Sequence, residues 1–343
     1  MSTIKEVANL AKVSTATVSH VINESANVSS ELRERVRKAI RTLDYRPNHV
    51  ARSLKMRRTS MLGMVVTDIT DPFFAQMIRG AEDAAREHGY LLTVFNTDDK
   101  LEQEKEVFAV LRSRRIDGIL LVSAPGKGSP KHLQQTLEDK VPVVCLARIP
   151  EGFPVDSVSI RNRENARECV QHLISVGHTR IAAIGGSNSV APARDRREGY
   201  LDALKEAGLP VDPALIAEGD FRSESGYRLG RQLLQLPDPP TALFVANGMM
   251  TVGLLKALDE LGLRCPGDVA LAAFGDRGVA EYLYPNVTVA AQPSYEIGYR
   301  GAELAIQRIH GELDPSEPVH IQLDAPLELK KSSLQTPAKV AAR

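Results

Sequence analysis

Short polar side chains stand at the start of a second helix predicted near the N-terminus, where they could contact DNA. Apolar residues recur at helical spacing in two consecutive runs, namely Ile4, Val7, Ala8 and Ala11, then Val18, Val21 and Ile22. Only a few residues separate the runs, and Ser14 is suited to capping the second helix. Two short helices joined by a tight turn form a helix-turn-helix, whose second helix enters the major groove. The pattern therefore predicts a DNA-binding head.

The distribution of charge supports a nucleic-acid partner for this head. Residues 1–60 hold 12 Lys and Arg against 5 Asp and Glu, which leaves +7, whereas the whole chain has 43 of each. Such asymmetry is typical of a chain in which one part contacts nucleic acid. The alternative is that the arginines between Arg33 and Arg41 only form the solvated face of a third helix, predicted from about Ser30 to Leu43. The helix pair in front of them favours the first interpretation.

Several motifs in the head and in the segment after it carry a resemblance to a known family. These are Thr3-Ile4-Lys5-Glu6-Val7-Ala8, Val13-Ser14-Thr15-Ala16-Thr17-Val18-Ser19-His20-Val21-Ile22-Asn23, Tyr45-Arg46-Pro47-Asn48 and Val50-Ala51-Arg52-Ser53-Leu54. Together they resemble the LacI/GalR (lactose-repressor) family of bacterial transcription regulators. The head is most similar to the branch that contains the purine and ribose repressors, and the resemblance extends over nearly the full length.

The resemblance implies DNA-contacting roles for individual residues. Positions that read base edges are matched by Thr15, Ala16 and His20. Positions that contact phosphates are matched by Ser14, Thr17, Asn23 and Tyr45. Residues about 48–56 match a hinge helix that orders on operator DNA, within a basic linker where Arg52 and Lys55 are also expected at the DNA. Leu54 matches a wedge that enters the minor groove, where an apolar side chain unstacks a base step and kinks the duplex; without the resemblance, Leu54 would be assigned to ordinary helix packing.

From Met61 onward the sequence predicts α/β layers. Short apolar runs such as residues 62–66, 119–122 and 143–146 alternate with helical segments, and a second such set begins near Arg163. Two similar sets favour two lobes with parallel sheets and a ligand between them. The resemblance implies a core of the periplasmic-binding-protein type. The expected domains are the head (1–47), the hinge and linker (48–60) and the two-lobed core (61–330). Lobe N takes about 61–160 plus 293–322, and lobe C about 161–292 plus 323–330.

Effector-binding positions of the family are matched in the core. The expected contacts are Phe73, Phe74, Ser123, Arg148, Arg194, Arg196, Phe221, Asn247, Asp276 and Gln292. Arg196 matches an arginine that grips the effector, and Phe221 an aromatic residue that stacks on it. The chain departs from the pattern of neutral-sugar binders at Ala147, Gly248 and Gly275, where aspartate is common.

The missing aspartates, together with Arg148, Arg194 and Arg277, predict a cleft of positive potential. Arginine suits carboxylates and phosphates, whereas aspartate suits sugar hydroxyls. We therefore expect an anionic effector, preferably a sugar acid of the gluconate or 2-ketogluconate type. A sugar phosphate, a neutral sugar and a purine stay open as alternatives. The competing interpretation of the three arginines is that they face solvent or pair with Asp195, Asp220 or Asp276.

Other functional classes are disfavoured. Nucleophile-elbow, zinc-protease and phosphate-loop motifs are missing from the sequence, so neither an enzyme nor a cofactor is expected. Three cysteines without CxxC spacing (Cys145, Cys169 and Cys265) argue against a metal site or a disulfide framework. A solute-binding protein for transport shares the expected core, but the N-terminal sequence reads as a basic head and not as a signal peptide. With no apolar run of membrane-spanning length, the expected location is the cytoplasm.

The expected mechanism is that of a dimeric regulator of carbohydrate or sugar-acid catabolism genes, most simply a repressor. Two heads of a homodimer would read the halves of a palindromic double-stranded operator, and the effector would alter the placement of the hinges. Ligand and DNA must then change each other's affinity by the same factor. Induction is favoured over corepression. The tail from Lys331 to Arg343 has no leucine heptads, so it predicts neither a tetramer nor an ordered segment.

Overall fold

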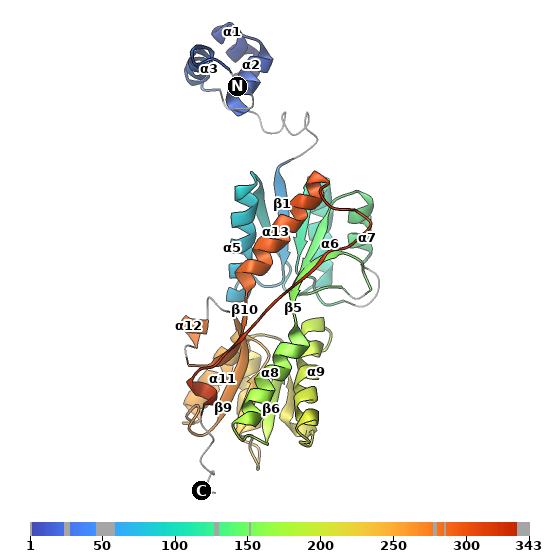
Figure 1. Cartoon of the computed structure of the whole chain (residues 1–343), viewed down its shortest axis with the longest axis vertical. Coiled ribbons are helices and arrows are strands. Elements are labelled where there is room, and N and C mark those ends of the chain that lie inside the picture. Colours follow the sequence, from blue (N-terminus) through green and yellow to red (C-terminus); the bar gives the residue numbers. More distant parts are fainter. Residues whose placement is uncertain are drawn as a thin grey trace. The chain divides into compact units, whose positions relative to one another are not determined.

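The chain divides into two compact units, Met1–Thr59 and Ser60–Arg343. The computed structural model describes residues 2–23, 28–45, 59–126, 130–150, 152–276, 280–284 and 286–334. The predicted hinge with Arg52, Leu54 and Lys55 lies outside the described residues, as does Arg277. Figure 1 gives the course of the chain.

The described residues of the first unit form three helices, α1 (Ile4–Ala11), α2 (Thr15–Asn23) and α3 (Ser30–Thr42). A capping box begins α1, because the Glu6 amide donates to Thr3 Oγ1 and the Thr3 amide donates to Glu6 Oε2. The helices enclose a small core of buried apolar side chains, listed as Val7, Ala8, Ala11, Val18, Val21, Val36 and Ala39. The helix pair predicted from apolar spacing is therefore present, with α3 packed against both of its members.

The second unit contains two six-stranded sheets, one in each lobe. The sheet of lobe N has the order β11-β5-β4-β3-β1-β2 and is parallel throughout. Its strands are β1 (Met61–Val66), β2 (Leu91–Asn96), β3 (Gly118–Leu121), β4 (Val143–Leu146), β5 (Asp156–Ile160) and β11 (His320–Leu323). The sheet of lobe C has the order β12-β10-β9-β8-β6-β7, in which only β12 is antiparallel to its neighbour. Its strands are β6 (Ile181–Gly185), β7 (Ile216–Glu218), β8 (Ala242–Val245), β9 (Ala270–Asp276), β10 (Thr288–Gln292) and β12 (Leu327–Glu328).

Helices cover both faces of each sheet, as parallel strands require. In lobe N, α5 (Pro72–Glu87) and α13 (Ser294–His310) cover one face, while α6 (Leu101–Ser113) and α7 (Lys131–Glu138) cover the other. In lobe C, α8 (Asn162–Ser175) and α9 (Ala191–Glu206) form one layer, opposite α10 (Ser223–Leu234) and α11 (Gly248–Glu260). The short helix α12 (Ala280–Leu283) precedes β10, and 3-10 turns occupy Pro213–Leu215 and Lys331–Ser333. Figure 1 shows α13 beside α5 and α8 beside α9.

Alternating side chains along β1 explain the two layers of lobe N. Leu62, Met64 and Val66 are buried in the cluster that includes α5 and α13, while Val65 joins the cluster that includes α6 and α7. The backbones of α5 and α13 lie so close together that a Cβ on Gly298 would stand 1.9 Å from the Met77 carbonyl oxygen. Only glycine allows this approach of the two backbones.

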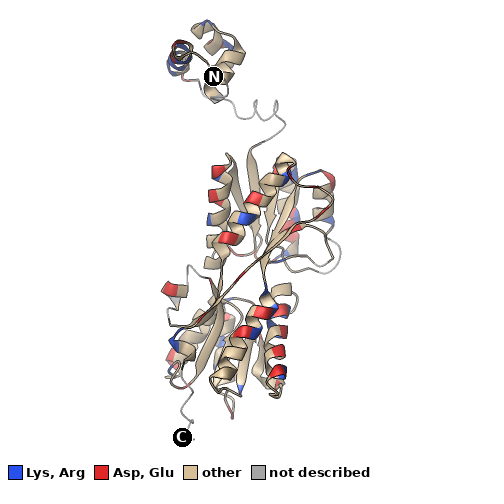
Figure 2. Cartoon of the chain, viewed as in Figure 1, with Lys and Arg blue, Asp and Glu red and all other residues tan. Residues whose placement is uncertain are grey.

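Charged residues of both signs are interspersed on the outward faces of the helices. Figure 2 shows lysines and arginines next to aspartates and glutamates along α8 and α9. Arg163, for example, contacts Asp202 and Glu198 across these two helices. No helix among the described residues is long and apolar enough to cross a membrane.

The chain passes between the lobes three times, after β5, after β10 and after β11. One prediction about its far end was wrong. Ser332 and Ser333, assigned from the sequence to a disordered tail, are buried at the end of the lobe C sheet. There the Thr288 amide donates to Ser332 Oγ at 2.8 Å, and Ser332 Oγ donates to the Leu271 carbonyl at 2.6 Å. Residues 335–343 of the predicted tail lie outside the described residues.

Candidate nucleic-acid interface and ligand pocket

The turn between α1 and α2 exposes most of the residues predicted to contact DNA. Ser14, Thr15, Ala16 and His20 are exposed, and Thr17 is half-buried. The Thr17 amide donates to Ser14 Oγ at 3.1 Å, so the predicted cap of α2 is present. The described structure thus presents these side chains on one short helix and its cap.

Two further contacts fix this turn against α3. Lys12 adopts a left-handed conformation, with φ of 52°, and ends α1. The guanidinium of Arg35 on α3 donates to the Ala11 carbonyl at 2.7 Å. Tyr45 is half-buried against the head's core, while the side chain of Asn23 lies outside the described residues.

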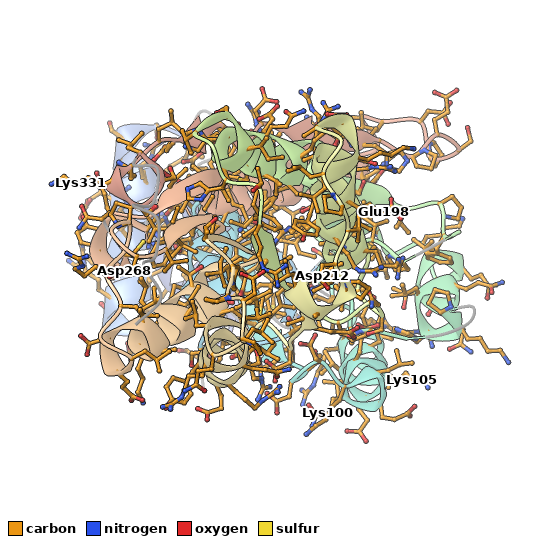
Figure 3. All side chains as sticks on the ribbon, turned by 90° about the horizontal axis from the view of Figure 1, so that it is seen from below. Lys100, Lys105, Glu198, Asp212, Asp268 and Lys331 are labelled. Atoms are coloured by element: carbon orange, nitrogen blue, oxygen red, sulfur yellow. The ribbon has the colours of Figure 1, made fainter. Side chains whose placement is uncertain are left out.

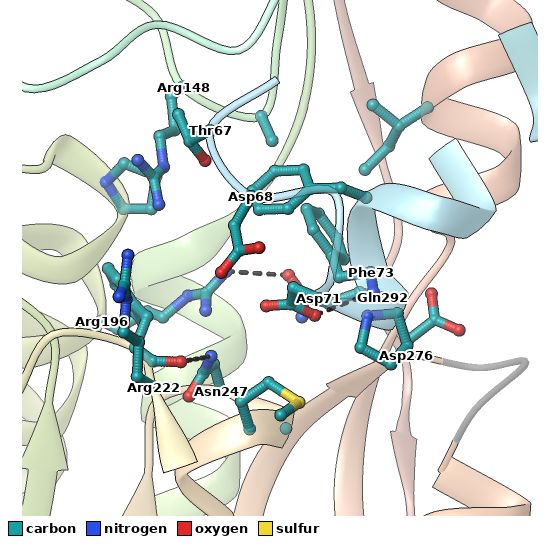
Figure 4. A pocket seen from close by; sticks show the side chains of 18 of the residues that line it. Thr67, Asp68, Asp71, Phe73, Arg148, Arg196, Arg222, Asn247, Asp276 and Gln292 are labelled. Atoms are coloured by element: carbon teal, nitrogen blue, oxygen red, sulfur yellow. Dashed lines mark hydrogen bonds between the residues drawn. The ribbon is translucent and has the colours of Figure 1, made fainter. Parts of the chain in front are cut away.

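In the second unit, a pocket lies between the strand ends of the two lobes. Its lining includes eight of the ten side chains predicted from the sequence, namely Phe73, Phe74, Arg148, Arg196, Phe221, Asn247, Asp276 and Gln292. Figure 4 shows Asp68, Asp71 and Arg148 from lobe N on one side, and Arg196, Arg222 and Asn247 from lobe C on the other. The two remaining predicted residues, Ser123 and Arg194, line a separate groove.

Arg196 is the central polar group of this pocket. Its Nε donates to Asn162 Oδ1 at 2.9 Å, its Nη2 donates to Gln292 Oε1 at 2.8 Å, and its Nη1 donates to the Ala246 carbonyl. The guanidinium carbon lies 3.9 Å from the centre of the Phe274 ring. Burial, and secondarily the charge of Arg148, lower the pKa of Arg196 to about 9. All three of these acceptors are neutral, so a buried positive charge is held without a carboxylate partner among the described contacts.

Arg148 is already paired. Its Nη1 donates to Asp99 Oδ1, and its guanidinium carbon lies 5.6 Å from the centre of the Phe221 ring and 6.0 Å from that of Phe74. Arg148 thus pairs with an aspartate, but with Asp99 and not with Asp195, Asp220 or Asp276, the partners considered from the sequence. The pairing reduces the positive charge that Arg148 can offer to a ligand.

Among the lining residues that the structure describes, carboxylates outnumber guanidinium groups. The lining includes the aspartates Asp68, Asp71, Asp99, Asp220 and Asp276, against the arginines Arg148, Arg196 and Arg222. Asp71 caps α5 by accepting from the Phe73 amide at 2.9 Å. Burial raises the pKa of Asp71 to about 6, with the backbone hydrogen bond opposing that shift.

Tyr284 is a lining residue that the sequence did not predict. A Cβ on Gly248 would lie 2.4 Å from the Tyr284 hydroxyl oxygen, and a Cβ on Gly275 would lie 3.1 Å from it. The phenol thus fills the space next to two of the positions where the sequence lacks the aspartates common in the family. Burial raises the pKa of Tyr284 well above its usual range. No spacing signal in the sequence linked Tyr284 to these glycines.

Comparison with known proteins agrees with this arrangement. Residues 59–332 match the family of periplasmic binding proteins and the sugar-binding domain of the LacI family, and residues 3–48 match the bacterial regulatory proteins of the lacI family. The chain belongs to the lacI family of bacterial regulatory proteins. It is a DNA-binding transcriptional repressor of the LacI type, with a helix-turn-helix head and a two-lobed α/β core.

Individual relatives cover most of the chain. The ribose operon repressor of Escherichia coli strain K12 is 37% identical over 309 residues, which are 90% of this chain and 93% of that protein. A structure of the transcriptional regulator CelR in complex with cellobiose is 34% identical, covers 97% of this chain and 100% of its own, and has a TM-score of 0.72. A structure of the lac repressor dimer bound to operator and the anti-inducer ONPF is 25% identical, covers 98% of this chain and 99% of its own, and has a TM-score of 0.83.

Proposed function

We propose that this LacI-type repressor binds a palindromic operator as a homodimer and is controlled by a small, neutral, polyhydroxylated ligand held in the pocket around Arg196. The observation that carries the ligand class is the charge of the described lining residues, five carboxylates against three guanidinium groups, with Asp99 and Arg148 paired to each other. Carboxylates accept hydrogen bonds from hydroxyl groups, and they repel an anion in a site of low dielectric.

The sugar acid predicted from the sequence is disfavoured by the same inventory. That prediction weighed the three arginines and the missing aspartates but not Asp68, Asp71 and Asp99, which come from loops after other strands. Arg148 is paired with Asp99, and Arg194 is not among the lining residues of this pocket. Among the described lining residues, Arg196 remains as the one buried cation, and three of its five N–H groups already have acceptors.

Aromatic rings supply the apolar part of such a site. Phe73, Phe74 and Phe221 line the pocket, and the Phe73 and Phe74 rings meet edge to face with their centres 5.2 Å apart. Aromatic faces suit the C–H faces of a sugar ring, while the surrounding carboxylates suit its hydroxyls. The cellobiose bound in the CelR structure, a neutral sugar, is in keeping with this class.

Calorimetric titration of the full chain tests the ligand class. Cellobiose and ribose represent neutral sugars, gluconate and 2-ketogluconate represent sugar acids, and hypoxanthine represents purines. We expect heat of binding only with a neutral sugar, weakened at least tenfold by Asp71→Asn. Asp259→Asn, which removes one exposed carboxylate from α11, is the matched control and should leave binding unchanged. Binding of gluconate in preference to every neutral sugar would overturn the proposal.

The DNA side of the proposal rests on the exposed start of α2. His20→Ala should reduce the preference for a selected palindromic duplex over an unrelated one by about 1–3 kcal/mol, measured by fluorescence anisotropy at fixed salt. An equal loss on both duplexes would remove His20 from base reading. Analytical ultracentrifugation should give twice the chain mass of 37.4 kDa, and a monomer would contradict the dimer.

Control by the ligand follows if it favours one arrangement of the lobes. We infer induction, in which a saturating neutral sugar weakens operator binding. The reciprocal experiment is a titration of sugar into the protein–operator complex, where sugar affinity must fall by the same factor. A sugar that tightens operator binding would indicate corepression instead.

A further inference from the structure

A second groove, here called the lateral groove, lies beside the ligand pocket and takes no part in the proposed effector site. Loops of lobe N that include Ser123, Lys131 and His132 line it together with Asn188 and Arg194 at the start of α9 in lobe C. Arg148 is the single lining residue that the groove shares with the ligand pocket. The groove therefore has walls from both lobes.

The N-terminus of α7 supplies unused hydrogen-bond donors to the lateral groove. Pro130 stands at the N-cap and provides no side-chain cap. Within the part of the chain that the structure describes, the amides of Lys131 and His132 have no acceptor, and the ammonium of Lys131 has no ion-pair partner. Unused amides and the helix dipole make such a terminus attractive to an anion.

His132 is a second, independent indication of a ligand. Its side chain is only 9% exposed, and its Nε2 lies 2.7 Å from Glu104 Oε1. Its other ring nitrogen, Nδ1, is buried without a hydrogen-bond partner. A buried polar atom without a partner is costly, so a group that supplies one would stabilise this site.

The charges along the lateral groove favour an anion. Its described lining residues include four cationic ones, Lys105, Lys131, Arg148 and Arg194, and one carboxylate, Glu104. Both carboxylate oxygens of Glu104 already have protein partners. Oε2 accepts from the Ala124 amide at 2.6 Å, and Oε1 lies 2.7 Å from His132 Nε2. Two cations are paired outside the lining, Arg148 with Asp99 and Lys105 with Glu102; Figure 3 shows Lys105 at the outer edge of α6. The other two cationic lining residues are Lys131 from lobe N and Arg194 from lobe C, whose Nη1 donates to the Asn188 carbonyl at 3.0 Å.

We propose that the lateral groove binds a small phosphorylated metabolite, with its anionic group at the N-terminus of α7 between Lys131, His132 and Arg194. Because the walls belong to different lobes, the bound anion stabilises one arrangement of the lobes over the other. Arg148 lies at the boundary with the ligand pocket, so occupation of the groove also changes the electrostatic potential that a ligand meets there. The groove is thus a second regulatory site for the repressor.

Thermal unfolding and calorimetry of the full chain test this site without DNA or sugar. The probes are pyrophosphate and 3-phosphoglycerate, with inorganic phosphate for comparison and sodium chloride at matched ionic strength as the blank. We expect binding with a dissociation constant below about 1 mM, weakened at least tenfold by Lys131→Glu. Lys140→Glu makes the same charge change just beyond the far end of α7, where Lys140 is exposed, and should leave binding unchanged.

Arg194→Ala is the second variant, and it tests the wall from lobe C independently of the fold of α7. Loss of binding in both Lys131→Glu and Arg194→Ala, with the Lys140 control intact, supports the site. If inorganic phosphate binds as tightly as 3-phosphoglycerate, the groove is a site for free phosphate, and the proposal of a phosphorylated metabolite is overturned. Equal weakening by Lys131→Glu and Lys140→Glu would mean an adventitious ion only. Binding lost in Arg196→Lys but kept in Lys131→Glu would place the anion in the ligand pocket and overturn the lateral site.

Discussion

The hydroxyl oxygen of Tyr284 lies only 2.4 Å from where a Cβ on Gly248 would stand. The two residues belong to different elements, since Gly248 begins α11 and Tyr284 follows α12. A side chain at position 248 would therefore require the buried phenol to shift. Next to Gly248 and Gly275, where aspartate is common in the family, the phenol of Tyr284 fills the space that a side chain would take.

Gly248→Ala should destabilise the core by about 1–3 kcal/mol, because the new methyl group meets the phenol. Tyr284→Phe removes the closest oxygen and leaves the ring carbon at 3.2 Å. The cost of Gly248→Ala should therefore be smaller in the Tyr284→Phe background, by at least about 0.5 kcal/mol. Urea unfolding of the four proteins of this double-mutant cycle measures the difference. Simple additivity would show that the two groups do not meet.

Asp71 predicts a pH dependence of stability. Its pKa is raised from 3.8 to about 6 on folding, so the folded protein holds this proton more tightly than the unfolded chain. The favourable contribution of the protonated form is complete below pH 3.8 and disappears as the pH rises through about 6. Asp71→Asn keeps a capping side chain for α5 but removes the charge. Near pH 7 the variant should be more stable than the native chain by up to about 3 kcal/mol, with the gap closing toward pH 4. Chemical unfolding between pH 4 and 8 measures this difference in the free energy of unfolding. A difference that does not change with pH would contradict the raised pKa of Asp71.

Two substitutions of Ser14 distinguish its contribution to the stability of α2 from its contribution to DNA affinity. Ser14→Ala removes the acceptor for the Thr17 amide and should cost about 0.5–2 kcal/mol, seen as faster hydrogen exchange of α2 amides. Ser14→Asp restores an acceptor but places a negative charge where a phosphate is expected. Ser14→Asp should therefore exchange like the native chain yet bind duplex DNA at least tenfold more weakly. Normal DNA binding by Ser14→Asp would remove Ser14 from the phosphate contacts.

Arg196→Lys tests whether the three hydrogen bonds of the Arg196 guanidinium stabilise the residues around the pocket. Lysine keeps the charge but lacks the planar donor set that reaches Asn162, Gln292 and the Ala246 carbonyl together. Loss of these bonds should destabilise the core by at least about 2 kcal/mol. Arg197→Lys is the matched control on the exposed face of α9 and should be neutral. A neutral Arg196→Lys in thermal unfolding would mean that the three acceptors find other partners.

Local patterns predicted the elements well, and the fold class was confirmed. Apolar spacing placed the two helices of the head and most strands of the core. Apolar spacing does not mark the start of α9, because Pro192 in its first turn resembles a loop signal, whereas the fixed φ of proline suits that position. The strand β5 and the helix α7 were not predicted either; the runs Asp156–Ile160 and Lys131–Glu138 mix polar and apolar residues, and their apolar positions are buried only by contacts distant in the sequence.

The pocket was harder to predict than the fold. Eight of the ten side chains predicted to contact the effector line one pocket. The charge balance was not predictable, because it depends on which loops converge. Asp99 lies 49 residues before Arg148 and is its partner. Tyr284 lies opposite two glycines on different strand ends, a relationship that only the folded chain creates.

The three passages between the lobes affect how the chain folds during its synthesis. The last strands to leave the ribosome, β11 and β12, form an edge of one sheet each, and β11 pairs with β5, which was made about 160 residues earlier. The helix α13 (Ser294–His310) likewise covers the lobe N sheet, whose first five strands are complete at Ile160, more than 130 residues earlier in the chain. Lobe N therefore lacks α13 and β11 until nearly the whole chain has been made, whereas lobe C lacks only the edge strand β12 and the buried Ser332 and Ser333.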